Sequence, residues 1–150
     1  MLVMDADCTY DPRDIRRMLA SAQECDEVIG LRIDKENIPL VHRFGNRIIS
    51  FTLSLLLGQR ILDPCSGMYL LRTDMARNLE ITSMGFDVEA EIVAQVLSFG
   101  KVAEVPISYR KRVGKSKLRS WYAGFRILLT AVKLGWLYNP VFLFGAIGSI

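Results

Sequence analysis

Short apolar runs alternate with segments of helical spacing along most of the chain, and this alternation constrains the fold more than any other feature of the sequence. The apolar runs, each as long as a strand, lie at 1–4, 28–31, 68–71 and 102–109. The helical segments lie at 12–19, 39–57, 74–79 and 86–99. Strands separated by helices are typical of an α/β domain with a mainly parallel sheet, and we predict that fold class.

Three of these segments carry more specific expectations. The run at 1–4 shows no polar alternation, which indicates a strand that is covered on both faces of its sheet. The apolar positions of 39–57 suit a mostly buried helix that ends at Gly58. Pro106 has no amide hydrogen, so the strand at 102–109 is expected at an edge of the sheet or at a bulge.

The charged residues are distributed unevenly along the chain. Residues 1–100 carry ten Lys or Arg against fifteen Asp or Glu, whereas residues 101–119 carry seven basic residues against Glu104 alone. An acidic front with a basic rear indicates a cation site, followed by a segment that meets phosphate or a membrane surface. The three cysteines and the single histidine are too widely spaced to predict a disulfide framework or a zinc site.

The end of the chain differs from the rest. Residues 120–150 are dominated by apolar and aromatic side chains, although Arg126 and Lys133 interrupt them. The uninterrupted part from Leu134 is shorter than the roughly 20 residues that a membrane-spanning helix needs. We predict an amphipathic helix followed by an apolar, membrane-associated tail. A core helix that packs on a part of the domain outside this chain is the alternative.

Asp5 and Asp7 directly follow the first apolar run. They are therefore expected beyond the carboxyl end of a strand, where α/β sheets bind ligands. Two carboxylates at this spacing can share a divalent cation and leave positions for phosphate oxygens, and oxygen ligands favour Mg²⁺ or Mn²⁺. The alternative is that both residues cap a turn, but Asp11 already supplies a cap for the helix that follows.

The stretch MLVMDADCT matches two known patterns. The first is the signature of the haloacid-dehalogenase phosphatases, in which Asp5 would be a phosphorylated nucleophile, Asp7 an acid or base, and Thr9 a structural partner. That family also needs a paired acidic motif that closes its metal site. No convincing Gly-Asp-x-x-x-Asp follows residue 72, so this pattern is the weaker of the two.

The second pattern is the D-x-D metal motif of GT-A nucleotide-sugar transferases, and later segments agree with it. These segments are DADCTYDP at 5–12, GLR at 30–32, RFGNRIIS at 43–50, DPCSGMYLLR at 63–72, GFDVEAEIV at 85–93 and EVPISYRKRVGKSKL at 104–118. In this order they resemble the family 2 glycosyltransferases of the dolichyl-phosphate sugar synthase type. The tail, NPVFLFGAIG, is similar to the ends of archaeal members of that family.

The resemblance implies a GT-A fold of which residues 1–119 form the C-terminal part, beginning at the D-x-D strand and followed by the tail at 120–150. It implies an inverting transfer of a hexose from a UDP- or GDP-linked sugar to dolichyl or polyprenyl phosphate, for protein N-glycosylation or cell-surface glycan synthesis. Such an enzyme works at the cytoplasmic face of the cell membrane and has no nucleic-acid partner. The first strands of the family precede the D-x-D motif, so we expect that they belong to a missing N-terminal half and that the chain alone has little activity.

The family pattern also implies roles for the residues of the D-x-D and S-G segments. Asp5 would contact the nucleotide and metal-bound waters, and Asp7 would be the direct metal ligand. Asp63, Ser66 and Gly67 match the D-x-x-S-G segment near the donor sugar and the acceptor, with Asp63 as a catalytic residue.

Basic residues match the positions around the transferred group and the acceptor phosphate. The phosphate-binding candidates are Arg32, Arg43, Arg110, Lys115, Ser116 and Lys117, and the catalytic ones are Arg47 and Arg112. The register stays open between Arg43 and Arg47 and between Arg110 and Arg112. GKS at 114–116 is not a P-loop, because Tyr109 stands where that loop needs a glycine. A non-catalytic membrane-binding protein that uses this basic segment and the tail is the alternative from another class.

A general base matters less for a phosphate acceptor than for a hydroxyl acceptor, because a phosphate monoester is mostly ionised above its second pKa of about 6. A hydroxyl acceptor would need Asp87, Glu89 or Glu91 as the base. Glu91 ranks first, since it aligns with a carboxylate that recurs in the family. A solvated acidic first turn of a helix is the alternative for Asp87 and Glu89.

Overall fold

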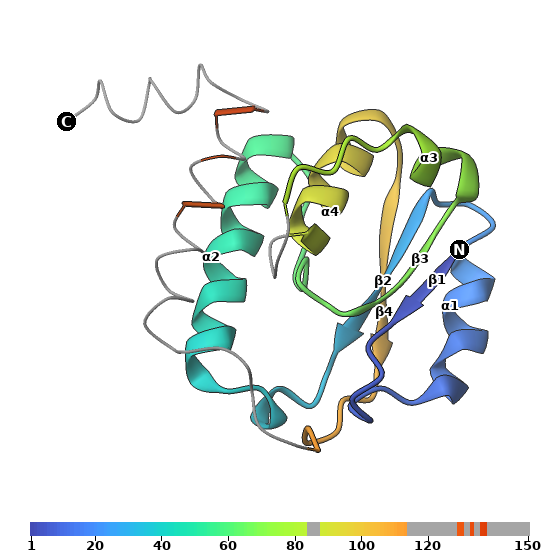
Figure 1. Cartoon of the computed structure of the whole chain (residues 1–150), viewed down its shortest axis with the longest axis vertical. Helices are drawn as coiled ribbons and strands as arrows, with labels where there is room; N and C mark the ends of the chain where they lie inside the picture. The colour runs from blue at the N-terminus through green and yellow to red at the C-terminus, as the bar shows by residue number, and fades with distance from the viewer. Residues whose placement is uncertain (84–87, 114–128, 131–132, 134–135, 138–150) are drawn as a thin grey trace.

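The computed structural model describes residues 1–83, 88–113, 129–130, 133 and 136–137. Within them the chain is an α/β domain with a four-stranded sheet, as predicted (Figure 1). The strands are β1 (Leu2–Met4), β2 (Glu27–Arg32), β3 (Met68–Leu71) and β4 (Val102–Ile107). The helices are α1 (Ile15–Ser21), α2 (Leu40–Leu57), α3 (Thr73–Asn78) and α4 (Val88–Phe99), with 3₁₀ turns at Pro12–Asp14 and Lys35–Asn37.

The sheet has the strand order β1-β3-β2-β4, and one of its strands is reversed. β2 and β4 are parallel neighbours, whereas β3 pairs antiparallel with both β1 and β2. Three strands therefore run in one direction, and β3 runs against them. The pattern of strands and helices did not predict this reversal, because it does not fix the course of the link at 58–67.

That link explains the reversal of β3. It runs back along α2, where Asn46 Nδ2 donates a hydrogen bond to the carbonyl of Leu62 (3.3 Å) and Ser54 Oγ accepts one from the amide of Ile61 (3.0 Å). Ser50 Oγ also donates to the Ile61 carbonyl. The link thus returns the chain to the end of the sheet from which α2 started, and β3 begins there.

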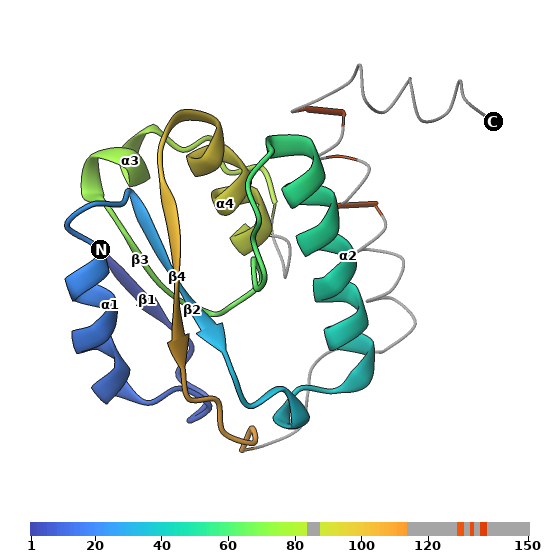
Figure 2. The same ribbon diagram turned by 180° about the vertical axis from the view of Figure 1, so that it is seen from behind.

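Helices cover both faces of the sheet (Figures 1 and 2). One face packs with α2 and α4 into a core that includes Ile29, Leu53, Leu71 and Val93. The other face packs with α1 into a second core around Met18, Val28, Met68 and Ile107. The alternation of buried side chains along β2 and β3 supplies both cores, since successive residues of a strand point to opposite faces.

Several local predictions are confirmed. Asp11 caps the turn before α1, where its side chain accepts a hydrogen bond from the amide of Arg13 (3.0 Å). Gly58 ends α2 in the left-handed conformation, with φ of 68°. Pro106 lies in β4, which is an edge strand of the described sheet.

Two predictions of burial are wrong. β1 is an edge strand of the described sheet, and its Leu2 and Met4 are exposed rather than covered on both faces. α2 buries the face that carries Ile49 and Leu53, but large apolar side chains on its other face, including Phe44, are exposed. Apolar composition alone did not distinguish a helix that is buried all round from one with two apolar faces.

The predicted amphipathic helix and tail at 120–150 fall almost entirely outside the described residues. No helix in the part that the structure describes is both long enough and apolar enough to span a membrane.

Glu27 is a buried acid at the start of β2. It is paired in register with Leu71 and Val102, two members of the core under α4, and its Oε2 atom has no hydrogen-bond partner among the described residues. Burial raises the pKa of Glu27 from 4.5 to about 8. The folded protein therefore holds the neutral acid at pH values where the unfolded chain ionises it.

This predicts a pH-dependent stability that Glu27→Gln removes. The free energy of unfolding of the native chain should fall as the pH rises from about 4.5 to about 8, by up to about 1.4 kcal/mol per pH unit. Urea unfolding at a series of pH values measures the slope, which Glu27→Gln should flatten, while Glu24→Gln at an exposed position should leave it in place. Equal slopes in the native chain and Glu27→Gln would contradict the prediction.

Candidate functional site

The candidate site lies at one end of the strands, where β1, β2 and β4 end and β3 begins (Figure 1). This edge of the sheet is formed by the ends of several strands and not by an outer strand. Met4 of β1 pairs with Met68 of β3, and the amide of Asp5 donates a hydrogen bond to the carbonyl of Gly67 (3.0 Å). The segment after β1 and the segment before β3 meet here because β3 is antiparallel. In a fully parallel sheet, residues 63–67 would lie at the opposite end of the strands.

The segment after β1 crosses this edge and pairs with the segment after β4. Tyr10 and Tyr109 form an antiparallel bridge, and the amide of Arg110 donates to the carbonyl of Thr9 (2.8 Å). The two tyrosine rings meet edge to face, with 5.3 Å between their centroids. The amide of Gly67 donates to the Tyr10 hydroxyl (2.8 Å), so Tyr10 joins three segments of the site.

The same bridge places Asp7 opposite Arg112. Asp7 precedes Tyr10 by three residues, and Arg112 follows Tyr109 by three residues. Antiparallel pairing of the two segments therefore brings Asp7 and Arg112 opposite each other. Arg112 Nε lies 2.8 Å from Asp7 Oδ2. Asp7 Oδ1 accepts hydrogen bonds from the amide of Thr9 (3.2 Å) and from its hydroxyl (2.5 Å). Thr9 therefore fixes the orientation of the Asp7 carboxylate.

Asp5 lies against the backbone of Gly67. A Cβ atom added to Gly67 would be 2.2 Å from Asp5 Oδ2 and 2.6 Å from Asp5 Cγ. Glycine is needed at this position because the carboxylate occupies the space of a side chain, rather than because of an unusual backbone angle. The S-G pair of the sequence motif thus includes the residue that makes room for the first carboxylate of the D-x-D motif.

The two carboxylates differ in their tendency to ionise. Burial and then the negative charge of Asp7 raise the pKa of Asp5 above its ordinary value, against the opposing charges of Arg112 and Arg32. Burial acts in the same direction on Asp7, but the hydrogen bonds from Thr9 and the charge of Arg112 outweigh it and lower the pKa of Asp7. Asp7 therefore ionises first as the pH rises.

This pair of carboxylates fits a hard divalent cation. The repulsion that raises the pKa of Asp5 is the kind that a bound cation relieves. Mg²⁺ is usually held by one or two carboxylates together with substrate phosphates. The described residues contain no group of three or more His, Cys, Asp or Glu side chains that could hold a metal ion. The further ligands of a cation on Asp5 and Asp7 would be substrate oxygens and water.

Arg32 and Asp63 form a buried ion pair at the end of β2. Arg32 Nη2 lies 2.5 Å from Asp63 Oδ1, while the Nε and the backbone amide of Arg32 donate to Asp63 Oδ2 (2.7 and 3.1 Å). The side chains are only 10% and 3% exposed. The guanidinium also lies 5.3 Å from the centre of the Tyr109 ring. Two predicted site residues thus bind each other and fix the link to β2.

Glu104 was not predicted as a site residue, yet it supports this pair. Its carboxylate in β4 accepts hydrogen bonds from the amides of Leu62 (2.9 Å) and Asp63 (2.7 Å). Burial outweighs these hydrogen bonds and raises the pKa of Glu104. The signal in the sequence is an acidic residue inside an otherwise apolar strand. Tyr10 and Tyr109 carry no comparable signal, because their roles depend on the crossing of two loops.

Glu91 makes contacts that differ from those of a general base. Its carboxylate accepts hydrogen bonds from the Thr82 hydroxyl (2.7 Å) and the Ser83 amide (2.8 Å), and Lys133 Nζ lies 3.3 Å away. Burial opposes ionisation, but these donors and the charge of Lys133 lower the pKa of Glu91 to about 2. A carboxylate with this pKa is a weak proton acceptor near neutral pH. Its catalytic role stays a prediction.

Glu89 in the first turn of α4 contributes to the ionisation of a tyrosine in β3. Burial, followed by the negative charges of Glu89, Glu27 and Asp5, raises the pKa of Tyr69 to about 12. The charges of Glu89 in α4 and Asp5 after β1 thus act on the same tyrosine of β3.

The remaining predicted site residues are distributed more widely. Arg110 pairs with Asp11 (2.5 Å) rather than with Asp7. Ser66 is buried beside Gly67, whereas Arg43 and Arg47 are exposed on α2, and no hydrogen bond or ion pair among the described residues joins them to Asp5 or Asp7. The predicted residues Asp87, Lys115, Ser116 and Lys117 lie outside the described residues.

Known proteins with similar sequences are archaeal glycosyltransferases. Glycosyltransferase AglJ of Haloferax volcanii is 31% identical over 155 residues, which cover 99% of this chain and 51% of the relative. The dolichyl-phosphate hexose transferase of the same organism is 31% identical over 138 residues, which cover 89% of this chain and 60% of the relative. No protein-family model matches the chain.

A solved structure has a fold similar to that of this chain. Glucosyl-3-phosphoglycerate synthase from Mycobacterium tuberculosis, crystallised with Mn²⁺, UDP and glucosyl-3-phosphoglycerate, has a TM-score of 0.64 and 15% identity. The match covers 89% of this chain and 48% of that one. The chain thus has the GT-A fold that the resemblance implied.

The chain is homologous to archaeal glycosyltransferases, as the sequence motifs predicted. This similarity favours the D-x-D pattern over the phosphatase pattern. The chain spans about half the length of the two Haloferax relatives described above.

The buried ion pair predicts that Asp63→Ala destabilises the protein strongly. Removing one partner of a buried pair leaves an uncompensated charge and costs about 3–5 kcal/mol. Arg72, directly before α3, and Asp74, in its first turn, form an exposed pair, so Asp74→Ala should cost far less. Chemical denaturation measures both values. Similar losses for the two variants would show that burial does not determine the strength of the Arg32–Asp63 pair.

The contact between Gly67 and Asp5 predicts that Gly67→Ala displaces the Asp5 carboxylate. We expect Mn²⁺ affinity, measured by electron paramagnetic resonance, to fall by about 10-fold or more, the effect of disturbing the support of a metal ligand. Gly100→Ala is the matched control, because a Cβ there also meets an aspartate carboxylate, 2.4 Å from Asp26 Oδ2, but just before β2 and β4 begin and so at the other end of the sheet. An unchanged Mn²⁺ affinity in a folded Gly67→Ala variant would contradict this interpretation.

Proposed function

We propose that this chain carries the metal-binding and acceptor-binding part of an inverting glycosyltransferase. Its substrates would be a UDP- or GDP-linked hexose and a dolichyl or polyprenyl phosphate, and its place the cytoplasmic face of the membrane. The observation that carries the proposal is the arrangement of Asp5 and Asp7 beside Gly67 and Arg112 at one edge of a GT-A fold. The names of the relatives support the lipid acceptor, since one is a dolichyl-phosphate hexose transferase and another a dolichol-phosphate mannosyltransferase.

In the proposed reaction, an oxygen of the acceptor phosphate attacks the anomeric carbon of the donor sugar. The bond between that carbon and the nucleoside diphosphate breaks, and the diphosphate leaves with the electron pair. Attack from the opposite face inverts the anomeric centre. No proton has to be removed from the acceptor, because the phosphate is already ionised above a pKa of about 6. This agrees with the weak basicity of Glu91.

The residues of the site have separate tasks in this scheme. Asp7, held by Thr9, and Asp5, seated on Gly67, would bind Mg²⁺ or Mn²⁺. The cation would stabilise the negative charge that develops on the leaving diphosphate. Arg112 is 42% exposed and can exchange Asp7 for a phosphate oxygen, which a guanidinium binds with directed hydrogen bonds.

Asp7→Asn tests this proposal. Loss of the carboxylate should weaken Mn²⁺-dependent binding of a UDP- or GDP-hexose by about 100-fold, the upper range for damage to a metal site. Isothermal titration calorimetry of the full 150-residue chain with and without Mn²⁺ measures the effect. Asp74→Asn removes an equal charge from an exposed position on α3 and is the matched control.

The activity assay completes the test. Transfer of radiolabelled hexose to polyprenyl phosphate, even at the low rate expected of the chain alone, should depend on Mg²⁺ or Mn²⁺ and be lost in Asp7→Asn. Nucleotide-sugar binding that is independent of metal, or unchanged in Asp7→Asn, would overturn the assignment of Asp7. Release of inorganic phosphate with a labelled Asp5 would instead support the phosphatase pattern.

A further inference from the structure

Glu91 is the centre of a cluster that joins three separate parts of the chain. It lies in the first turn of α4, and its carboxylate accepts hydrogen bonds from the amides of Thr82 (3.2 Å) and Ser83 (2.8 Å). The Thr82 hydroxyl also donates to it (2.7 Å). Lys133 Nζ lies 2.7 Å from Thr82 Oγ1, 3.2 Å from Ser83 Oγ and 3.3 Å from Glu91 Oε1. We call these four residues the Glu91 cluster.

The cluster is built around a buried charge. The side chain of Glu91 is only 4% exposed, whereas that of Lys133 is 38% exposed. Burial of a carboxylate is costly unless hydrogen-bond donors and a counter-ion satisfy it, and the cluster supplies both. Removal of Lys133 would leave a buried negative charge without its partner, so the two residues are expected to depend on each other.

The same face of α4 also holds the segment that leads into the helix. Gln95 lies one turn after Glu91, and side chains at this spacing share a helix face. The amide of Glu80 donates a hydrogen bond to Gln95 Oε1 (3.0 Å), and Gln95 Nε2 donates to the Glu80 carbonyl (2.9 Å). The backbone of residues 80–83 is thus bound by two side chains of α4, and Lys133 is added to this arrangement from a distant part of the chain.

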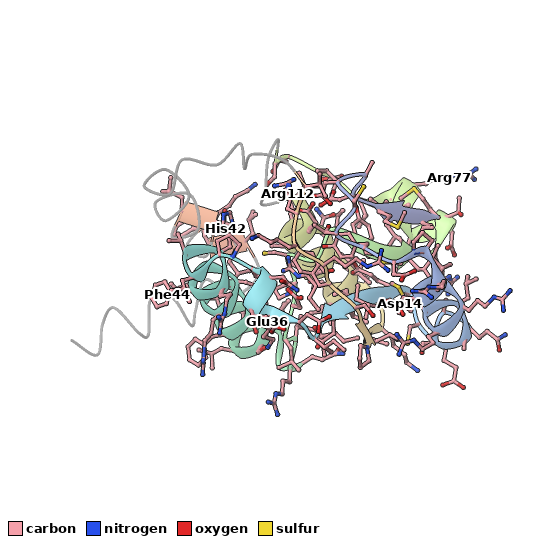
Figure 3. The ribbon with its side chains drawn as sticks, turned by 90° about the horizontal axis from the view of Figure 1, so that it is seen from below. Asp14, Glu36, His42, Phe44, Arg77 and Arg112 are labelled. Carbon is pink, nitrogen blue, oxygen red and sulfur yellow. The ribbon has the colours of Figure 1, made fainter. Side chains whose placement is uncertain are left out.

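The cluster lies at the end of α4 that points toward the candidate site. α4 ends at Phe99 and β4 begins at Val102, so the last turn of α4 is at the end of the sheet remote from the site (Figures 1 and 2). The first turn of α4 therefore points toward the end where β4 finishes. Figure 3 looks onto that end of the strands and labels Arg112, which follows β4.

The residues around Lys133 are apolar on their exposed side. Thr130 is buried, whereas Leu129, Trp136 and Leu137 are 52%, 56% and 55% exposed. An acceptor with a polyprenyl chain offers an apolar surface that such side chains can contact. Lys133 therefore attaches an apolar segment to the same turn of α4 that points toward the site.

We propose that Glu91 is a positioning residue for the acceptor, which acts through Lys133. Together they hold the described residues of 129–137 against the first turn of α4, so that an acceptor bound along this segment presents its phosphate to the site. This inference rests on the proposed function, in which the acceptor is a lipid phosphate. It gives Glu91 a task that needs no proton transfer.

The first experiment measures transfer of radiolabelled hexose by the full chain at several concentrations of polyprenyl phosphate. Glu91→Gln and Lys133→Met should each lower kcat/KM for the acceptor by about 10-fold or more, because small displacements of a positioned reactant have effects of this size. The double variant should lose no more than either single variant, since both break the same contact. Lys133→Arg keeps the charge and should keep most of the activity. Lys101→Met removes an exposed lysine just before β4, at the other end of the sheet, and is the control.

Other roles of the two residues predict different results, and either would overturn the proposal. If Glu91 were a general base, Glu91→Gln would abolish transfer and change its pH profile, whereas Lys133→Met would do neither. If Lys133 bound the acceptor phosphate, Lys133→Met would weaken transfer, whereas Glu91→Gln, which frees the ammonium group, would not. Mn²⁺-dependent binding of a nucleotide sugar should be the same in both variants and the native chain, which a general loss of structure would not allow.

The second experiment tests the contact without any substrate. Urea unfolding of the native chain, the two single variants and the double variant gives a double-mutant cycle. The changes in the equilibrium constant of unfolding should be non-additive by about 5-fold or more, within the range for residues in direct contact. Circular dichroism checks that the variants remain folded. Additive changes would show that Glu91 and Lys133 are not coupled and would overturn the inference.

The two experiments separate this inference from the proposed function. A native chain that binds a nucleotide sugar and transfers hexose, with Glu91→Gln and Lys133→Met as active as the native chain, would overturn the positioning role alone. A native chain that does neither would count against the proposed function, while the cycle in unfolding still decides whether the pair is coupled.

Discussion

The reversed direction of β3 is the constraint on which the rest of the site depends. α2 carries the chain away from the edge where β2 ends, and the link along Asn46 and Ser54 brings it back before β3 begins. The start of β3 therefore meets the ends of the other three strands. Gly67 can then receive the Asp5 carboxylate, and Asp63 can reach Arg32. The same helices and strands around a fully parallel sheet would place these residues at opposite edges.

Two arginine–aspartate pairs at this edge differ in the one property that decides their role. Arg32 and Asp63 are almost fully buried, so separating them leaves a charge without solvent and costs several kcal/mol. Arg112 and Asp7 are 42% and 18% exposed, and such a pair contributes about 1 kcal/mol or less. The first pair is thus a fixed part of the framework, and Glu104 supports it from β4. The second pair can open when a ligand offers better partners.

Much of the fold could be predicted from the sequence, because strand-length apolar runs and helical spacing are local properties. The bounds of α2 and the edge position of Pro106 followed from Gly58 and from the missing amide of proline. The direction of β3 and the contacts of Tyr10 and Tyr109 did not, since they depend on how two links cross the sheet edge. The exposure of Phe44 was also missed, because composition does not show that a helix has two apolar faces.

The ion pair between Asp7 and Arg112 affects how a cation and a diphosphate would bind together. A cation that binds Asp7 in the proposed enzyme displaces a guanidinium and leaves it without an anion, whereas a diphosphate that arrives with the cation supplies one. Each ligand then increases the affinity for the other by the same factor, as thermodynamic linkage requires. In the empty site Arg112 is the counter-ion of Asp7, and in the filled site the cation would take the place of Arg112 on Asp7 while the diphosphate pairs with Arg112. Such a site discriminates against free metal ions without any residue devoted to that task.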